Sequence, residues 1–284
     1  MSNFIHNVHI LPKKNHQRAH DLSWEIRDWL GEKGVWAAIY NHEDYSDQFG
    51  KEEDTPDIIM VLGGDGTILN VVGKLQKREV PLLGFNFGHV GFLTELDPDH
   101  WKHDLEKVLQ GEFSISERLV LKYKLIRDGE VIQKGSFIND LVVGRGSLAR
   151  LVDLSLWTGE EPITEIRADG LIVSTPLGST AYSVAAGGPL ISPELDVLEL
   201  CPVCPFLKDM RPVVLPSSSV ITIRVETPYQ GGFLTLDGQT GMDLESGDWI
   251  VIEKSSKQMQ LIQLSKSSYV QKLKSKGYID SGKH

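Results

Sequence analysis

The segment GGDGT at residues 63–67 combines one carboxylate, Asp65, with glycines that leave the backbone accessible. A short apolar run, 57–62, precedes it, and residues 67–76 follow with apolar side chains at helical spacing. Glycines allow a tight turn and a close approach of the backbone to a ligand, and Thr67 is expected to cap the helix. The first helical amides then face the same point, which predicts an anion site beside an acid. Such an acid binds a magnesium ion or accepts a proton from an attacking hydroxyl.

A second segment, DGLIVSTPLGSTAY at residues 169–182, is dense in small hydrogen-bond donors. Hydroxyls stand at positions 174, 175, 179 and 180, and Gly178 lies among them. A loop of free amides and hydroxyls suits phosphates or ribose hydroxyls, and the ring of Tyr182 offers a face for a base. The GGDGT segment matches neither the dinucleotide fingerprint G-x-G-x-x-G nor the Walker sequence G-x-x-x-x-G-K-[ST], so neither class is assigned.

The elements that carry the first segment alternate between strand-like and helix-like patterns. This alternation predicts a parallel sheet covered by helices. The expected strands are 7–11, 35–40, 57–62 and 81–85, and the expected helices are 16–30, 67–76 and 98–109.

From about residue 117 the pattern changes to short β-rich runs separated by turns. The Asp-Gly pairs at 128–129 and 237–238 are strong hairpin signals. We predict an α/β plus β fold, with a Rossmann-like parallel-sheet domain at 1–117 and a β-rich, sandwich-like domain at 118–255. Residues 256–284 are expected to form a C-terminal tail that docks back on the first domain. The expected strands of the second domain are 119–127, 131–143, 152–157, 171–174, 220–225, 233–236 and 249–253.

The chain has 284 residues, with 29 Lys plus Arg against 39 Asp plus Glu, for a formal net charge of −10. Such an acidic chain is a poor candidate for wrapping nucleic acid or lying on an anionic membrane, so we expect neither partner. Two cysteines, Cys201 and Cys204, exclude a disulfide framework, and we interpret them as incidental thiols in a loop. The N-terminus shows no signal peptide, and no run approaches ~18 apolar residues, so we expect a cytoplasmic protein.

Together the two segments resemble those of the NAD kinases, which phosphorylate the 2′-hydroxyl of the adenosine ribose of NAD to give NADP. GGDGT alone is shared with lipid kinases of the diacylglycerol and sphingosine type. The longer run DGLIVSTPLGSTAYSVAAGGP is similar to the second signature of the NAD kinases. The pair Asn139-Asp140, the run LLGFNFGHVGFLTEL at 82–96 and the triplet DGQ at 237–239 also resemble family segments. The resemblance covers roughly residues 57–250, in the expected order.

The resemblance implies an enzyme that transfers the γ-phosphoryl of ATP to NAD with Mg²⁺, and that assembles as a homodimer or homotetramer. Asp65 would be the general base that accepts the 2′-hydroxyl proton, and no residue is assigned as a metal ligand. Arg167 favours ATP over polyphosphate and NAD over NADH. The nucleotide contacts that the resemblance implies are Gly63, Gly64, Gly66, Thr67, Asn139, Asp140, Arg150, Arg167, Asp169, Thr180, Ala181, Tyr182, Ser183, Val184, Ala185 and Gln239.

Two departures from the family pattern leave alternatives open. The family often shows C-P-H-[ST]-L-[ST]-x-R-P where this chain has CPFLKDMRP at 204–212, so the histidine and both hydroxyls are missing. Asp140 stands where glutamate is common. A lipid kinase is an alternative that GGDGT alone would favour. A nucleotide sensor without turnover is another, which the altered 204–212 segment would favour.

Overall fold

The computed structural model describes residues 5–41, 45, 55–75, 79–88, 91–146, 151–206, 210–226, 232–264 and 268–280. The chain divides into two compact units. Unit 1 comprises Met1–Glu117 and Met259–His284, and unit 2 comprises Arg118–Gln258. Among the described residues, no helix is long and apolar enough to cross a membrane.

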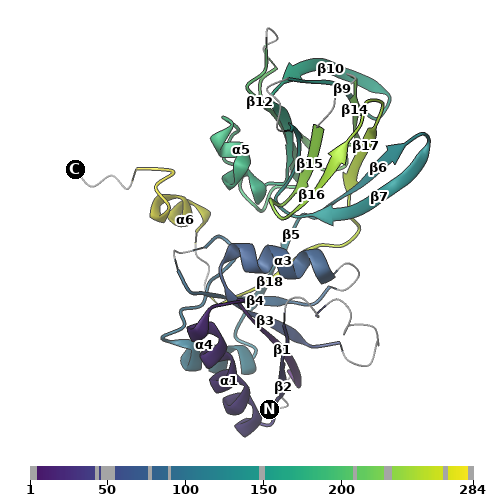
Figure 1. Cartoon of the computed structure of the whole chain (residues 1–284). Helices are drawn as coiled ribbons and strands as arrows, with labels where there is room; N and C mark the ends of the chain where they lie inside the picture. The colour runs from purple at the N-terminus through teal and green to yellow at the C-terminus, as the bar shows by residue number, and fades with distance from the viewer. Residues whose placement is uncertain are drawn as a thin grey trace. The chain divides into compact units, whose positions relative to one another are not determined.

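Unit 1 is built on a six-stranded sheet with the order β2-β1-β3-β4-β18-β5 (Figure 1). The pairs β1–β2, β1–β3, β3–β4 and β4–β18 are all parallel, as the alternating pattern predicts. The strands are β1 (Asn7–Pro12), β2 (Trp36–Ile39), β3 (Ile58–Gly63), β4 (Leu82–Asn86), β5 (Ser114–Arg118) and β18 (Met259–Gln263).

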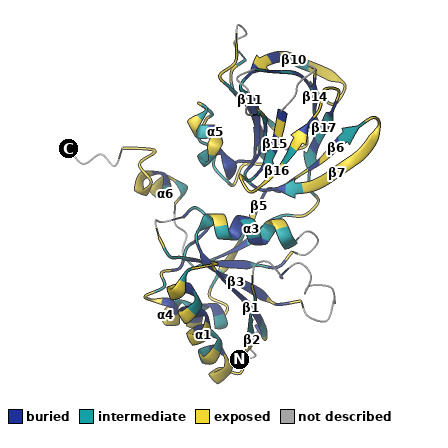
Figure 2. Ribbon diagram, viewed as in Figure 1, coloured by how far each residue is buried: buried dark blue, intermediate teal, exposed yellow. Residues whose placement is uncertain are grey.

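Helices cover both faces of this sheet. Helices α1 (Gln17–Glu32) and α4 (Trp101–Leu109) lie on one face and α3 (Asp65–Leu75) on the other (Figure 1). Alternate residues of β3, such as Met60, join the apolar cluster beneath α1 and α4. On the opposite face, Ile68 of α3 packs on Gly84 of β4. Strand β3 is therefore buried along its whole length, which explains its continuous apolar sequence (Figure 2).

The C-terminal segment differs from a simple tail. Strand β18 pairs with β4, with Leu261 opposite Leu82, and helix α6 (Tyr269–Ser275) follows it. The strand has only five residues and no flanking hairpin signal, so its sequence did not predict it. The helix begins with a capping box formed by Ser268 and Gln271, a local signal that the lysine- and serine-rich composition of this segment obscures.

Unit 2 is a sandwich of two antiparallel six-stranded sheets. One has the order β10-β9-β14-β17-β6-β7 and the other β13-β12-β11-β8-β15-β16. Apolar side chains from both sheets form a single core, which confirms the predicted sandwich-like β domain. The strands are β6 (Leu121–Arg127), β7 (Glu130–Phe137), β8 (Asp140–Arg145), β9 (Val152–Thr158), β10 (Glu161–Ala168), β11 (Gly170–Ser174), β12 (Val197–Val203), β13 (Val213–Pro216), β14 (Ile221–Val225), β15 (Gly232–Leu236), β16 (Thr240–Leu244) and β17 (Trp249–Lys254).

Both predicted Asp-Gly hairpins are confirmed, because the two residues of each pair adopt positive φ. The expected single strand 131–143 is wrong, since the chain forms β7 and β8 in different sheets. The break falls at Ile138 and Asn139, whose backbone N–H groups bond the Asp237 carboxylate. A long-range side chain thus interrupts a run that looks continuous in the sequence.

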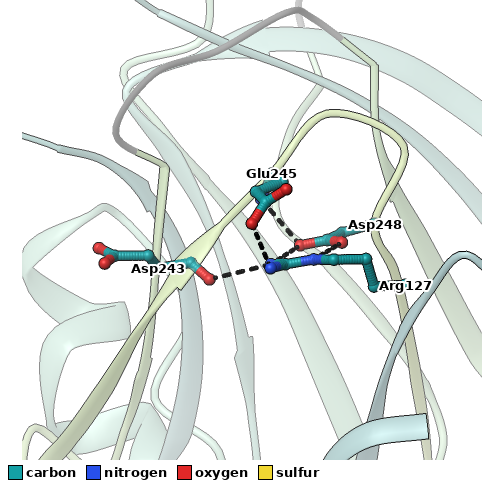
Figure 3. A network of polar contacts seen from close by, with 4 residues as sticks. All are labelled: Arg127, Asp243, Glu245 and Asp248. Atoms are coloured by element: carbon teal, nitrogen blue, oxygen red, sulfur yellow. Dashed lines mark hydrogen bonds and ion pairs between the residues drawn. The ribbon is translucent and has the colours of Figure 1, made fainter. Parts of the chain in front are cut away.

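The turn between β16 and β17 is fixed by an ion-pair network (Figure 3). Arg127 at the end of β6 donates through Nε and Nη2 to the two oxygens of the fully buried Asp248, each at 2.8 Å. It also contacts the Glu245 carboxylate and the Asp243 carbonyl. This bidentate pairing raises the pKa of the Arg127 guanidinium, which stays charged. The ion pair joins the end of β6 to the turn that precedes β17.

The two thiols differ from the expected loop pair. Cys201 is buried within β12, whereas Cys204 is exposed just after the strand with φ of 47°. Burial raises the pKa of the Cys201 thiol, so it is a core side chain rather than a redox partner of Cys204.

Candidate active site

Asp65 lies at the carboxyl end of β3, at the point where the strand order of unit 1 reverses. Strand β1 pairs with β2 on one side and β3 on the other. Just beyond β1, the Lys13 N–H donates to the Leu62 carbonyl at 2.8 Å, which joins the ends of the two strands. In open α/β sheets, ligands bind at the carboxyl ends of the strands beside such a reversal.

The helix after the loop begins earlier than expected. Its first residue is Asp65, and the Gly64 carbonyl accepts hydrogen bonds from the N–H groups of Thr67 and Ile68. The prediction that Thr67 caps this helix is therefore wrong. Its hydroxyl lies inside the first turn, where it accepts a hydrogen bond from the Gly64 N–H at 3.4 Å and lies against Gly63. A Cβ on Gly63 would stand 2.3 Å from that hydroxyl, so this glycine is required by the turn itself.

The carboxylate of Asp65 is held by the backbone of the segment that follows β4. Its Oδ1 accepts hydrogen bonds from the Leu93 N–H at 3.1 Å, the Thr94 N–H at 3.2 Å and the Thr94 hydroxyl at 3.3 Å. Its Oδ2 accepts the Phe92 N–H at 2.8 Å. Donors on both oxygens fix the plane of the carboxylate, and Oδ2 keeps more free acceptor capacity than Oδ1.

Gly91 makes room for this arrangement, because a Cβ there would stand 2.1 Å from Asp65 Oδ1. Gly64 and Gly66 have a different character. Apart from the adjoining residues and the backbone of the helix itself, no heavy atom of the described chain lies within 4 Å of the position that a Cβ on either would occupy. Neither glycine has positive φ, so the fold itself does not require them. Space beside a bare backbone at a strand terminus is suited to a ligand.

In unit 2, three segments far apart in the sequence meet at the start of β8. The carboxylate of Asp237 accepts hydrogen bonds from the N–H groups of Ile138, Asn139 and Asp140, the shortest at 2.7 Å. In return the Asp237 N–H donates to the Asp140 carbonyl at 2.9 Å. The predicted DGQ turn is thus joined to the Asn-Asp pair, and Gln239 lies exposed two residues further on.

The hydroxyl-rich loop reaches the same point. The Thr175 N–H donates to the Asn139 carbonyl at 2.9 Å, and the Thr175 hydroxyl donates to the Ile138 carbonyl. Gly178 packs so closely that a Cβ on it would stand 2.0 Å from the Asn139 carbonyl oxygen. The structure therefore brings together Asn139, Asp140, the 175–182 loop and the Asp237 turn.

Asp140 is almost fully buried in this cluster. Burial, followed by the charge of Asp237, raises the pKa of Asp140 to about 7, while a hydrogen bond from the Tyr182 backbone acts in the opposite direction. Burial also raises the pKa of Asp237, and this outweighs its three backbone donors. Two neighbouring enclosed carboxyls therefore compete, and the fold favours a proton on Asp140 near neutral pH.

Helix α5 (Tyr182–Ala185) follows the short 3-10 turn η2 (Gly178–Thr180). Its side chains differ in exposure to solvent. Tyr182 is 48% exposed and presents its ring to solvent. Ser183 is fully buried, and a Cβ on Gly188 would stand 2.1 Å from its hydroxyl and 2.2 Å from the Glu199 carboxyl. Burial raises the pKa of that Glu199 carboxyl. The Ser183 side chain therefore points into the interior, toward Glu199 of β12, and does not face solvent.

Two predicted residues lie apart from this cluster. Strand β11 pairs Ser174 with Asp140 at one end and Gly170 with Gly144 at the other. Asp169 precedes Gly170, five residues from Ser174, which places it roughly 17 Å along the strand from the Asn-Asp pair. Arg167 also lies at that end and pairs with Asp153 at 3.5 Å, whereas Asp169 pairs with Arg145 at 3.2 Å. The predicted contact Arg150 lies outside the described residues, as do 207–209 of the altered CPFLKDMRP segment.

The sequence did not point to the partners of these residues. Phe92 to Thr94 lie within the LLGFNFGHVGFLTEL run, which predicts no role for them individually. Thr175 lies in the hydroxyl-rich segment and Asp237 in the DGQ triplet, and neither pattern predicts the contacts that they make. Backbone donors leave no trace in side-chain identity, so spacing cannot find the cradle around Asp65. Gly91 is the one sequence feature near this segment that indicates the contact, because the neighbouring Asp65 carboxylate leaves no room for a side chain there.

The part of the chain that the structure describes forms no metal cage of its own. Among the described side chains, no group of three or more His, Cys, Asp or Glu residues converges. Mg²⁺ in phosphoryl-transfer sites is commonly held by one or two carboxylates together with substrate phosphates. A cation held mainly by phosphate oxygens would fit beside the open glycine backbone, next to the Asp65 carboxylate.

The fold and these two loop clusters are those of a nucleotide-dependent kinase. The family model for the ATP-NAD kinase N-terminal domain matches residues 32–113, and that for the ATP-NAD kinase C-terminal domain matches residues 138–264. The chain belongs to the NAD kinase family. A lipid kinase would account for GGDGT alone, whereas the family matches cover both units.

Individual relatives agree over nearly the full length. An NAD kinase of Nitratidesulfovibrio vulgaris Miyazaki F is 40% identical over 279 residues, which are 98% of this chain and 99% of the relative. An NAD kinase of Geotalea daltonii is 38% identical, over 95% of this chain and 97% of the relative. The crystal structure of yeast NADH kinase with NADH has a TM-score of 0.88 at 26% identity, over 99% of this chain and 89% of that one. An Archaeoglobus fulgidus NAD kinase in complex with ATP has a TM-score of 0.73 at 26% identity, over 92% and 95%.

Proposed function

We propose that this protein transfers the γ-phosphoryl of ATP to the 2′-hydroxyl of the adenosine ribose of NAD, and that Asp65 is the general base. The observation that carries the role of Asp65 is its carboxylate, fixed by backbone donors beside the bare backbone of Gly64 and Gly66. A rigid acceptor next to space for a phosphate is what a hydroxyl needs in order to attack a phosphorus atom.

The proton transfer uses Oδ2 of Asp65. Oδ1 already accepts three hydrogen bonds, whereas Oδ2 accepts only the Phe92 N–H among the described groups. The 2′-hydroxyl donates to Oδ2 as its oxygen forms the new bond to phosphorus, and the β–γ bond of ATP breaks to release ADP. The carboxylate takes the proton, so the attacking oxygen carries less positive charge in the transition state.

Unit 2 supplies the contacts to the dinucleotide. The Asn139 side chain and the Asp140 carboxyl bind the adenine and ribose side, and the exposed ring of Tyr182 stacks on a base. The Thr180–Ala185 backbone and Gln239 complete this part of the site. Arg167 and Asp169 contact more distant parts of an extended ligand, and the family resemblance implies that Arg150 also contacts the nucleotide. The loops around Asn139 are tied to one another, which supports a preformed site.

Unit 1 supplies the phosphate contacts. Gly63, Gly64, Gly66 and Thr67 lie against the ATP phosphates at the start of α3, where the positive end of the helix dipole favours an anion. Mg²⁺ would neutralise charge on those phosphates, and the phosphate oxygens themselves would hold it beside Asp65. From the family resemblance and the cysteine usage, we further propose a cytoplasmic homodimer or homotetramer.

The test is Asp65→Asn, with kcat and the NAD dissociation constant measured separately. We expect kcat to fall by about 10² or more, because the amide cannot accept the proton, while NAD affinity stays nearly unchanged. Asp99→Asn, which removes an exposed carboxylate of the same unit, is the matched control and should keep the wild-type rate. A wild-type kcat in Asp65→Asn would overturn the general-base assignment.

A further inference from the structure

The C-terminal helix α6 contacts the segment that holds Asp65. The Lys272 Nζ donates to the Phe92 carbonyl at 3.2 Å. The Phe92 ring lies 6.3 Å from the Tyr269 ring and 6.2 Å from the Tyr278 ring, centroid to centroid. Lys276 Nζ stands 5.0 Å from the centroid of the same ring. Four residues in and just beyond α6 thus converge on one residue, across 180 positions in the sequence.

Phe92 is also the residue whose N–H binds Asp65 Oδ2. Its N–H therefore faces the carboxylate, while its carbonyl and its ring face α6. Both ends of the residue are held, and the next two N–H groups along the chain, from Leu93 and Thr94, bind Asp65 Oδ1. A shift of Phe92 would move all of these donors relative to the carboxylate.

We infer that α6 is a clamp that sets the orientation of the Asp65 carboxylate through Phe92, and that Lys272 is its positioning residue. The inference rests on the proposed role of Asp65 and adds a second requirement, that the base is aligned by the C-terminal segment. Lys272 acts through the peptide of Phe92, whose carbonyl it binds.

The construction of α6 supports a clamp rather than a free appendage. A helix of seven residues is unstable alone, so its position depends on its contacts. It has one buried side chain, Leu273, and is fixed at its start by the Ser268–Gln271 capping box. The cationic and aromatic contacts to Phe92 are therefore a large part of what α6 contributes to unit 1. A misplacement of the base by about 1 Å is enough to lower a rate markedly.

The experiment compares Lys272→Met with Lys274→Met, an exposed lysine on the same helix, in the full-length chain. We expect Lys272→Met to lower kcat about tenfold with the KM values for NAD and ATP within twofold of wild type. Lys272→Arg, which keeps the donor, should restore most of kcat. Amide hydrogen exchange at Phe92, Leu93 and Thr94 should be faster in Lys272→Met and unchanged in Lys274→Met.

The double variant Asp65→Asn/Lys272→Met separates the two claims. If Asp65 is the base and Lys272 only aligns it, the double variant is no slower than Asp65→Asn alone. If Asp65→Asn keeps the wild-type rate, the proposed role of Asp65 fails, whereas exchange at Phe92 to Thr94 still reports on the clamp. Should Lys272→Met not fold, Tyr278→Leu removes the ring contact at a half-exposed site and carries the same expectation. Kinetics and amide exchange equal to those of Lys274→Met would overturn the clamp.

Discussion

The burial of Asp140 beside Asp237 gives the site a dependence on pH at the scale of single residues. The folded protein raises the pKa of Asp140 to about 7, against 3.8 for an ordinary aspartate. The folded state thus binds this proton more tightly than the unfolded state does. The contribution of Asp140 to stability is complete below about pH 4 and is lost as the pH rises through 7.

We therefore predict that Asp140→Asn stabilises the protein at pH 8 and has little effect on stability at pH 4 to 5. Because the amide has no charge to bury, the gain at pH 8 should be roughly 2–4 kcal/mol in the free energy of unfolding. Denaturant titrations of both proteins between pH 4.5 and 8.5 measure it. Asp243→Asn, which removes an exposed carboxyl of unit 2, is the control. If the free energies of unfolding of Asp140→Asn and wild type differ by the same amount at every pH, the folded state does not raise the pKa of Asp140.

The residue types of the site could be predicted from sequence, but their partners could not. Asp65 is recognisable because glycines surround it, and Asn139 and Asp140 because they stand between the two signature segments. The donors that hold Asp65 are backbone N–H groups 27 to 29 positions away. The inward position of Ser183 could not be predicted either, because its neighbour Glu199 lies on strand β12, 16 positions further along the chain.

At the scale of elements, the close packing of the hydroxyl-rich loop on β8 can be tested at Gly178. A Cβ there would stand 2.0, 2.4 and 2.7 Å from three backbone atoms of Asn139, which cannot yield as a flexible side chain would. We predict that Gly178→Ala lowers stability by about 1–3 kcal/mol, and that it raises the KM for NAD because Asn139 is displaced.

Gly73→Ala is the matched control for Gly178→Ala. Gly73 lies in α3, and nothing is within 4 Å of the position of its Cβ. Alanine in a helix interior is about 1 kcal/mol better than glycine, so this variant should be slightly more stable than wild type. Denaturant unfolding and KM measurements on both variants check the pair. A Gly178→Ala variant with wild-type stability and KM would contradict the packing described for this loop.

Elements with a strong local pattern could be predicted, and those fixed from afar could not. Strands β1 to β4 and helices α1, α3 and α4 followed from periodicity, because most of them bury an apolar face or run, whereas the largely exposed strand β5 was not predicted. The first turn of α3 was misplaced because the Gly64 carbonyl, not the Thr67 side chain, accepts the first helical N–H groups. Strand β18 needs the edge of β4 to form, and the division between β7 and β8 needs Asp237.

At the scale of the whole molecule, the chain contributes to unit 1 from both of its ends. Strand β18 joins the parallel sheet and α6 reaches the segment beside Asp65. The sequence indicated a two-part α/β plus β fold because its pattern changes near residue 117. Strand-like and helix-like runs alternate before that point, whereas short β-rich runs separated by turn signals follow it. The lysine- and serine-rich composition of the C-terminal segment did not indicate that Lys272 would contact Phe92, whose N–H binds Asp65.

The measurement that tests the central claim most directly is the formation of NADP by the purified full-length chain with NAD, ATP and Mg²⁺. An NADP-specific dehydrogenase detects the product, which also identifies the 2′ position of the new phosphate. We predict NADP formation that depends on ATP and is lost in Asp65→Asn. A protein that binds NAD yet forms no NADP would contradict the account and would favour a nucleotide sensor, with the altered 204–212 segment as the first place to look.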